Sequence, residues 1–404
     1  MTTSQRTFLG VMIGGAVVLA IALGVRHSFG LFLSPMSDDY GWGRETFAFA
    51  IAIQNLVWGL AQPFTGAFAD RFGAGRVILV GAVVYALGLW GMSGAATPLM
   101  LTMSTGVLIG LALSATSFSV ILGAVGRVVP DAQRPMAMGL VSAAGSLGQF
   151  LMLPGVLGMI RGFGWQGALI GLAILALMML PFASMVRVRA AQPLPNTPAQ
   201  TLSQALGEAF SSPDFWLLSL GFFVCGFQLV FIGLHLPAYL VDQQLPATVG
   251  TTVLALVGLF NIVGTWLAGW LGSRLFRAGL LAWIYLLRSV VIVLFLWLPL
   301  TPWSAYLFGM AMGVLWLSTV PLTNSIVATI FGVRNLSMLG GIVFLFHQVG
   351  SFAGGWLGGY LFDRTGSYEL VWQISIGLGV LAALLNMRVT ERPVARIQTV
   401  QEAG

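Results

Sequence analysis

Residues 66–76 read Gly-Ala-Phe-Ala-Asp-Arg-Phe-Gly-Ala-Gly-Arg, a short charged loop between two long apolar segments. A related run, Gly-Trp-Leu-Gly-Ser-Arg, occupies residues 269–274, which is a shift of 203 residues. By the same shift, Arg161, Gly164 and Trp165 correspond to Arg364, Ser367 and Tyr368. Two unrelated loops that agree on one offset indicate an internal duplication, so the sequence predicts two similar halves.

The apolar segments around these loops identify a membrane protein. Of the 404 residues, 58% are hydrophobic and only 7% are charged, whereas soluble domains average about 25% charged residues. Apolar runs of about 18 residues or more recur along the whole chain, which predicts transmembrane helices. The first run is interpreted as a retained helix, because no small-residue cleavage site is evident and further spans follow at once. The single cysteine, Cys225, excludes an intramolecular disulfide and a cysteine-based metal cluster.

Twelve transmembrane helices are expected, six in each half. We place them at residues 8–35, 45–69, 76–95, 98–126, 135–160, 164–186, 214–241, 248–273, 279–298, 302–331, 335–361 and 368–388. The predicted fold class is an all-α membrane protein with two pseudo-symmetric six-helix bundles. The predicted domains are an N-terminal bundle at 1–186, a cytoplasmic linker at 187–212, a C-terminal bundle at 213–390 and a cytoplasmic tail at 391–404. The linker is rich in proline and polar residues, with a short surface helix expected near residues 202–210.

All 18 basic residues are arginines, and their distribution predicts the orientation. With the N-terminus inside, thirteen fall in cytoplasmic segments and three in outer loops, while Arg26 and Arg288 lie within spans. This bias predicts a multi-pass protein of the inner (cytoplasmic) membrane with both termini in the cytoplasm. The net charge of +6 therefore reflects topology, and no nucleic-acid partner is expected. We also expect a monomer in the lipid bilayer, with no cofactor, no metal and no enzymatic activity, because the sequence has no nucleotide-binding loop or catalytic constellation.

The first loop resembles the signature between helices two and three of the major facilitator superfamily. That signature has a glycine, three residues, Asp-Arg, a further glycine and two basic positions, of which the second is missing here. The resemblance implies the major facilitator fold and transport by alternating access. Gly66 and Gly73 permit a tight turn and close helix approach, and Asp70 is expected to pair with a basic group or to face a helix N-terminus. With Arg71 and Arg76 these residues form the predicted conformational-gate motif; the alternative is an ordinary positive-inside loop.

A narrower resemblance extends over nearly the whole chain. Seven short runs are similar to bacterial monocarboxylate-transporter-like and oxalate/formate-antiporter-like proteins, at residues 29–35, 40–44, 127–130, 134–139, 145–149, 346–350 and 363–368. The resemblance implies a secondary active transporter of a small organic anion, preferably a monocarboxylate, by proton symport or anion exchange. In that family the eighth helix often carries an arginine four residues after an Asn or Asp, but here Asn261 is followed by Thr265. Either another arginine supplies the charge or the substrate is not a simple carboxylate.

Arg26 is the first candidate to hold the anion. It lies in Gly-Val-Arg-His-Ser-Phe-Gly at residues 24–30, well inside the first apolar segment, where a charge costs roughly 2.5–3.5 kcal/mol to insert. Its planar, permanently charged guanidinium suits carboxylate or phosphonate oxygens. The alternative is a structural partner bonded to backbone carbonyls. That alternative is stronger for the second candidate, Arg288, because helix nine is mostly scaffold in this superfamily.

The other candidates are polar or aromatic side chains within the spans. Substrate contacts are predicted for His27, Gln54, Asn55, Trp58, Gln149, Gln228, Asn261, Thr265, Trp316, His347 and Gln348, with interhelical hydrogen bonding as the alternative for each. No acidic residue lies in the middle of a span, so proton coupling requires a histidine or the acid group of the substrate. The coupling candidates are therefore His27, His235 and His347.

Two other functions compete with anion transport. The nearer one is efflux of a hydrophobic or neutral small molecule, with Arg26 purely structural; the missing helix-eight arginine and the many aromatic residues favour it. A membrane enzyme or a sensor is disfavoured, because the sequence has neither a catalytic constellation nor a sizeable soluble domain.

Overall fold

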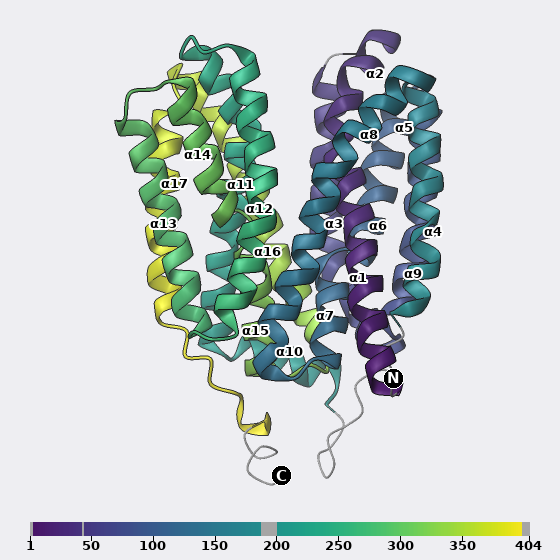
Figure 1. Cartoon of the computed structure of the whole chain (residues 1–404), viewed down its shortest axis with the longest axis vertical. Helices are drawn as coiled ribbons and strands as arrows, with labels where there is room; N and C mark the ends of the chain where they lie inside the picture. The colour runs from purple at the N-terminus through teal and green to yellow at the C-terminus, as the bar shows by residue number, and fades with distance from the viewer. Residues whose placement is uncertain (1–2, 43, 187–199, 398–404) are drawn as a thin grey trace. The chain divides into compact units, whose positions relative to one another are not determined.

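The computed structural model describes residues 3–42, 44–186 and 200–397, and these residues form helices and connecting loops without strands. Figure 1 shows the chain as a ribbon. The helices are α1 Thr3–His27, α2 Leu33–Tyr40, α3 Arg44–Phe72, α4 Ala74–Ser93, α5 Pro98–Leu101, α6 Ile109–Thr116, α7 Phe118–Val128, α8 Arg134–Leu177, α9 Met179–Met185, α10 Leu202–Phe210, α11 Pro213–Asp242, α12 Ala247–Gly272, α13 Arg277–Trp297, α14 Pro302–Leu315, α15 Thr319–Phe331, α16 Leu336–Thr365 and α17 Glu369–Met387. Two 3₁₀ turns, Phe29–Phe32 and Asp131–Gln133, and a π-helical stretch, Thr102–Leu108, join some of them.

Ten segments of the described chain are long and apolar enough to cross a membrane. The segment Asp131–Met185 is 55 residues long and contains two crossings, because α8 turns sharply at Gly164, where a φ of 72° favours glycine. Helix α3 adds another crossing by its length of 29 residues, although Gln54, Asn55 and Gln62 make it less apolar. Counted in this way, the described residues contain the twelve predicted spans.

The residues cluster into two compact units, each of which is described by itself. Unit 1 comprises the described parts of Met1–Pro130 and Ala144–Ala199 together with the short segment Val333–Gly341. In it α3 packs against α4 and α6, and α1 packs against α7 and α9 (Figure 1). A Cβ atom on Gly24 would lie 2.7 Å from the carbonyl oxygen of Gly148, so these two glycines bring α1 and α8 into backbone contact.

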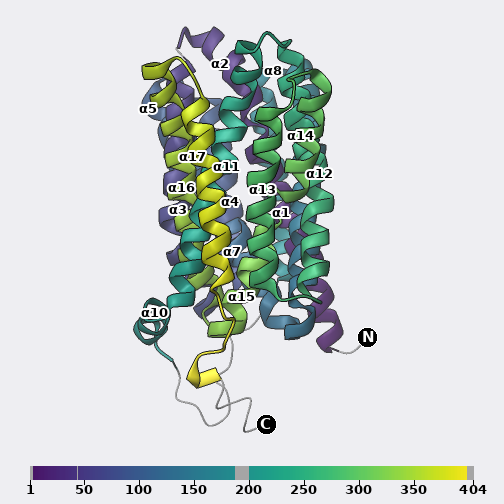
Figure 2. The same ribbon diagram turned by 90° about the vertical axis from the view of Figure 1, so that its left-hand side faces the viewer.

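Unit 2 comprises Asp131–Ala143, Gln200–Gly332 and the described part of Ile342–Gly404. Helix α12 packs against α14, and α13 runs beside α17, as Figure 2 shows. An aromatic cluster around Trp372 forms much of its core, with Phe295 and Phe308 stacked at a centroid distance of 4.2 Å. Gly226 approaches the backbone of His347, which holds α11 tightly against α16.

The two units differ from the predicted halves at the starts of α8 and α16. The first turns of α8 belong to unit 2, where a Cβ on Gly139 would lie 2.7 Å from the Cα of Gly269. The start of α16 belongs to unit 1, where Gly66 lies directly against the backbone of Ser337. Close glycine contacts therefore hold the start of α8 in unit 2 and the start of α16 in unit 1.

The predicted linker and tail are only partly described. Residues 187–199 of the linker and 398–404 of the tail lie outside the described residues. Helix α10, Leu202–Phe210, stands where the short surface helix is predicted. It forms there because Thr201 and Gln204 make a capping box, which satisfies backbone N–H groups at its first turn.

Two of the spans are interrupted. Helix α6 ends at Thr116 and α7 begins at Phe118, with Ser117 between them in extended backbone conformation. Helix α14 ends at Leu315 and α15 begins at Thr319. The 203-residue shift places Ser117 at position 320, next to the second break. Each break leaves backbone groups that the helix itself cannot satisfy, and side chains of neighbouring helices bind them.

Candidate functional site

In unit 1 the candidate site is organised around Arg26, in the last turn of α1. The half-buried Arg26 donates a hydrogen bond from Nη2 to Oδ1 of Asn55 at 2.7 Å. Its guanidinium carbon lies 5.8 Å from the ring centroid of Trp58, within reach of a cation–π interaction. No carboxylate of the described residues forms an ion pair with Arg26. Among the described residues the charge is therefore held by an amide and an aromatic ring, without a counter-charge.

Two buried nitrogen donors of unit 1 have no acceptor in the described part of the chain. They are Nε of Arg26 itself and Nε2 of Gln149 on α8. Gln149 follows Gly148, which contacts Gly24 two residues before Arg26, so the two donors lie on helices in backbone contact. A buried donor without an acceptor costs about 1–3 kcal/mol. An acceptor oxygen of a ligand at either nitrogen would remove that cost there.

The Trp58 side chain is fixed by the break between α6 and α7. Its Nε1 donates toward Oε1 of Gln62 and Oγ of Ser117, each at 2.9 Å. Gln62 in turn donates from Nε2 to the carbonyl oxygen of Ser114 at 2.7 Å. The interrupted helix thus positions the ring beside Arg26. Gln62 and Ser117 were not among the predicted site residues, although a run of hydroxyl residues at 114–119 marks the place.

Two other predicted residues of unit 1 point elsewhere. Gln54 is fully buried and donates to the carbonyl oxygen of Thr105 at 2.9 Å, in the π-helical stretch. The His27 ring is exposed, and its Nδ1–H donates to the carbonyl oxygen of Leu23 one turn earlier at 2.8 Å. Gln54 therefore joins two helices, and His27 is bonded to its own helix.

In unit 2 the fully buried Arg288 holds the break between α14 and α15. Its Nε and Nη2 donate to the carbonyl oxygen of Leu315 at 3.1 and 2.6 Å, and Nη2 also donates to that of Trp316. From α12, Oδ1 of Asn261 accepts from the backbone N–H of Leu317 at 3.0 Å. Thr265 donates to the carbonyl oxygen of Asn261 at 2.7 Å. This is the geometry of a structural clamp, in which only Nη1 of Arg288 is left without an acceptor among the described residues.

His347 on α16 lies in a buried polar and aromatic setting. Its ring stacks on Phe344 with centroids 5.3 Å apart and planes 7° apart. Nδ1 lies 3.3 Å from Oε1 of Gln348 and 3.4 Å from Oγ of Ser351, while Nε2 is buried without a partner in the described chain. One ring nitrogen is thus positioned by neighbours, and the other makes no hydrogen bond within the described chain.

The two remaining candidates of unit 2 join helices. The fully buried Gln228 donates from Nε2 to the carbonyl oxygen of Ser375 at 3.0 Å, which connects α11 to α17. The partly buried His235 bonds through Nε2 to the carbonyl oxygen of Gly355 at 2.8 Å and lies 3.3 Å from the Tyr368 hydroxyl through Nδ1. Both ring nitrogens of His235 are therefore engaged.

The gate motif places the Asp70 carboxylate at the N-terminus of α16. Oδ1 accepts from the backbone N–H of Ser337 at 3.2 Å, and Oδ2 accepts from that of Met338 at 2.8 Å. Arg127 lies 3.1 Å from Oδ1 and also donates to Oγ of Ser337. A helix N-terminus favours a negative charge, so all three contacts stabilise the ionised carboxylate. Arg127 is a member of this site that the sequence interpretation did not include.

The second copy of the motif is built differently. Ser273 donates to the carbonyl oxygen of Trp270 in its own helix at 2.7 Å and makes no contact like that of Asp70 within the described chain. Instead Asp131, which precedes α8, lies 2.5 Å from Arg134 and 3.7 Å from Arg277. Because the Asp131 side chain is 56% exposed, these ion pairs are screened by water and contribute little.

Comparison with known proteins supports one family over most of the chain. The profile of the Major Facilitator Superfamily matches residues 12–320. The uncharacterized MFS-type transporter YcxA of Bacillus subtilis is 27% identical over 386 residues, covering 90% of each chain. Monocarboxylate transporter 11 of Mus musculus is 26% identical over 372 residues, covering 87% of this chain and 80% of that protein. Monocarboxylate transporter 13 of Bos taurus is 24% identical over 391 residues, covering 94% and 89%.

Solved structures agree at the level of the fold. The E. coli fucose:proton symporter FucP superimposes with a TM-score of 0.74 at 13% identity, covering 96% of this chain and all of that chain. The human organic anion transporter MFSD10 gives a TM-score of 0.71 at 17% identity with the same coverage. Together with the profile match over residues 12–320, these similarities show that the chain belongs to the Major Facilitator Superfamily.

Proposed function

We propose that this transporter binds a small organic anion, preferably a monocarboxylate, on the guanidinium of Arg26. The observation that carries the proposal is a charge that has no counter-charge among the described residues. Arg26 is bonded to Asn55 and lies beside Trp58, and its buried Nε has no acceptor in the same part of the chain. A carboxylate would supply the missing charge, and its oxygens would accept from Arg26 and Gln149. Charge-assisted hydrogen bonds of this kind contribute about 1.5–3 kcal/mol each.

The relatives support this substrate class. The names of two mammalian relatives describe them as monocarboxylate transporters. Thr265 stands where the resemblance to monocarboxylate-transporter-like proteins implies an arginine, and it is occupied by its bond to Asn261. We therefore assign the charged contact to α1 and not to α12. Transport follows alternating access, with the Asp70 contact to the start of α16 stabilising one end state.

For coupling we propose His347 rather than His27 or His235. His347 is buried and has one ring nitrogen without a partner among the described residues, whereas His27 is exposed and His235 is bonded through both nitrogens. If protons are symported, uptake into proteoliposomes rises when the outside is acidified, and His347→Gln removes that rise. If uptake does not depend on the pH gradient but requires an acid inside the liposomes, the mechanism is anion exchange.

The second candidate function is efflux of a hydrophobic or neutral compound. The observations in its favour are the aromatic rings beside Arg26 in unit 1 and, separately, beside His347 in unit 2, which suit apolar ligands. Under this alternative the guanidinium of Arg26 is a structural group, and the net charge of the ligand does not affect transport.

Matched pairs of substrates separate the two functions. The purified protein is reconstituted in liposomes and tested for counterflow with labelled short-chain acids, hydroxy acids, keto acids and aryl carboxylates, each beside the carboxamide of the same carbon skeleton. We expect flux with at least one acid and none with its amide. Equal flux of an acid and its amide would contradict the anion proposal and support efflux of neutral compounds.

A further inference from the structure

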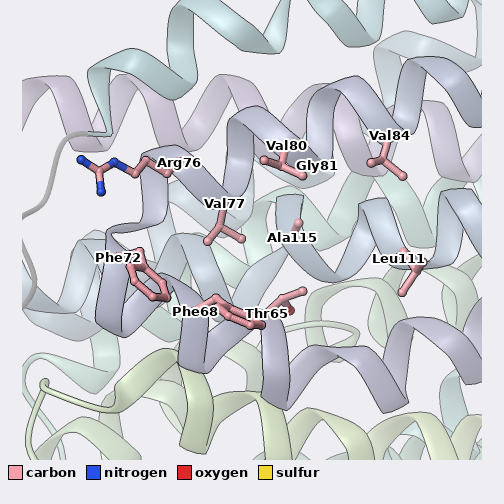
Figure 3. Close-up of a pocket in the computed structure, with 10 residues that line it drawn as sticks. All are labelled: Thr65, Phe68, Phe72, Arg76, Val77, Val80, Gly81, Val84, Leu111 and Ala115. Carbon is pink, nitrogen blue, oxygen red and sulfur yellow. The ribbon is translucent and has the colours of Figure 1, made fainter.

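A groove of about 420 Å³ runs along the outside of unit 1 between α3, α4 and α6. Figure 3 shows Phe68 and Phe72 on one wall, Val80 and Val84 on the other, and Leu111 on the floor. The groove does not contain Arg26 or any residue bonded to it. It is a separate site, and its chemistry differs from that of the candidate substrate site.

The walls of the groove suit an apolar ligand. The only hydroxyl in the lining belongs to Thr65, which lies 3.0 Å from the carbonyl oxygen of Ser114 and is thereby satisfied. The side chains of Phe68, Phe72 and Val80 are 57%, 46% and 65% exposed. Because α3 and α4 cross the membrane, these exposed surfaces contact lipid and not water. A ligand that reaches the groove therefore comes from the bilayer.

One end of the groove carries positive charge. Arg76 stands at the end nearest the loop between α3 and α4, beyond Phe72 and Val77 (Figure 3). Its side chain is exposed and forms no hydrogen bond or ion pair within the described chain. Arg71 is exposed close by in sequence, with its guanidinium 5.2 Å from the ring centroid of Phe72. The neighbouring carboxylate, Asp70, is buried, accepts hydrogen bonds from the start of α16 and forms an ion pair with Arg127.

We propose that the groove binds one acyl chain of an anionic glycerophospholipid, with the lipid phosphate paired to Arg76 and Arg71. From Arg76 to Val84 the groove extends about 12 Å along α4 at 1.5 Å per residue. One leaflet of the hydrocarbon core is about 15 Å deep, so the groove accommodates most of a chain whose headgroup lies at the membrane surface. The positive-inside distribution assigns this end to the cytoplasmic leaflet, where basic sites between helices bind anionic headgroups.

The bound lipid would join α3 to α4 beside the loop that contains the gate motif. The acyl chain contacts residues of both helices, and the phosphate bridges Arg71 at the end of α3 and Arg76 in the first turn of α4. An anionic lipid is therefore expected to stabilise unit 1 more than a zwitterionic lipid with the same chains.

Lipid retention tests the proposal. The purified full-length protein is incubated with dioleoyl phosphatidylglycerol or dioleoyl phosphatidylcholine and examined by native mass spectrometry. We expect one phosphatidylglycerol to be retained in preference to phosphatidylcholine. Arg76→Gln should weaken phosphatidylglycerol retention about fivefold, the effect of about 1 kcal/mol per surface cation, without changing phosphatidylcholine. Arg6→Gln, which removes an exposed arginine from the start of α1, is the charge-matched control and should have no effect.

A second pair of variants tests the apolar part. Val84→Trp places a large ring in the groove, whereas Val83→Trp adds the same ring to the neighbouring exposed position outside it. We expect only Val84→Trp to reduce retention of both lipids. Equal retention of the two lipids by the unmodified protein, an equal loss from Arg6→Gln and Arg76→Gln, or an equal loss from the two tryptophan variants would overturn the proposal.

Discussion

Two arginines, Arg26 and Arg288, lie in the interior of predicted spans, and their surroundings give them different roles. Arg288 donates to main-chain carbonyl oxygens of Leu315 and Trp316, which are the free acceptors at the end of α14. Arg26 donates to the side-chain amide of Asn55 and keeps one buried N–H group free of any acceptor in the described chain. Placing a charge inside a membrane costs free energy, and such residues usually pair within the protein or contact a ligand. Arg288 binds the backbone of a neighbouring helix, and we assign Arg26 to the contact with the ligand.

Asn55→Asp tests whether Arg26 is open to an anion. The new carboxylate would pair with the guanidinium and supply the charge that we assign to the substrate. We therefore expect the variant to remain folded, with an unfolding temperature equal to or above that of the unmodified protein, while acid-driven counterflow falls at least tenfold. Asn55→Ala is the control for loss of the amide and should reduce counterflow less. Full activity of Asn55→Asp would contradict the role of Arg26.

Arg288→Met tests the structural clamp. It removes the side-chain donor that the described residues provide to the carbonyl oxygens of Leu315 and Trp316, at a cost of about 1–3 kcal/mol for each oxygen. We expect a lower unfolding temperature by tryptophan fluorescence and partial recovery in Arg288→Lys, which keeps a donor. If Arg288→Met abolished counterflow while the unfolding temperature stayed the same, Arg288 would belong to the substrate site.

Among the elements, the start of α16 depends on one carboxylate from α3. Asp70→Asn removes the charge that faces the N-terminus of α16 and leaves Arg127 buried without its ion pair. We expect faster hydrogen exchange in peptides covering residues 336–341, by about tenfold, together with slower counterflow. Ser273→Ala changes the matching position of the second copy and should leave these peptides unaffected. Unchanged exchange in Asp70→Asn would mean that the carboxylate does not stabilise this helix start.

Glu391 is one of the tail residues that attach the described part of the tail to unit 2, beside Val394 and Arg396. Oε1 of Glu391 accepts from the backbone N–H of Ala278, at the first turn of α13, at 2.7 Å. Arg277 lies 3.8 Å from the other carboxylate oxygen. Burial raises the pKa of Glu391 above its ordinary value, and the contacts with Ala278 and Arg277 oppose that rise.

This raised pKa determines the direction in which the free energy of unfolding changes with pH. The folded chain holds the Glu391 proton more tightly than the unfolded chain does, so the free energy of unfolding falls as pH rises above the ordinary glutamate pKa of about 4.3. Glu391→Gln removes this dependence. We expect the unfolding temperature of the variant, minus that of the unmodified protein, to increase with pH over this range. The single, buried Cys225 allows unfolding to be followed with a thiol-reactive dye. A difference that stays constant or decreases with pH would contradict the assignment.

For the whole molecule, the sequence predicted the twelve spans because long apolar runs and arginine-rich loops are read directly from composition. It did not predict the breaks at Ser117 and at residues 316–318, because neither contains a glycine or a proline. A break of this kind depends on acceptors and donors from other helices, such as Gln62, Asn261 and Arg288. Those partners are distant in sequence, and only a structure brings them together.

The candidate site, like the fold, was only partly predictable from the sequence. The polar residues of the first two spans were identified, and the structure brings Asn55 and Trp58 to Arg26. Their neighbours Gln54 and His27 face elsewhere, because one residue along a helix changes the direction of a side chain by about 100°. The sequence gives residue spacing but not which face of a helix meets its neighbour. The choice between these adjacent residues therefore required the structure.

The most direct test of the central claim is the affinity of Arg26 variants for matched ligands. Direct binding of the best acid from the counterflow panel, and of its carboxamide, is measured for the purified protein, Arg26→Lys and Arg26→Gln. We predict that Arg26→Gln loses about 10- to 150-fold in affinity for the acid, which corresponds to about 1.5–3 kcal/mol, with Arg26→Lys in between and no change for the carboxamide. A folded Arg26→Gln protein that binds the acid as tightly as the unmodified protein would show that the anion is held elsewhere.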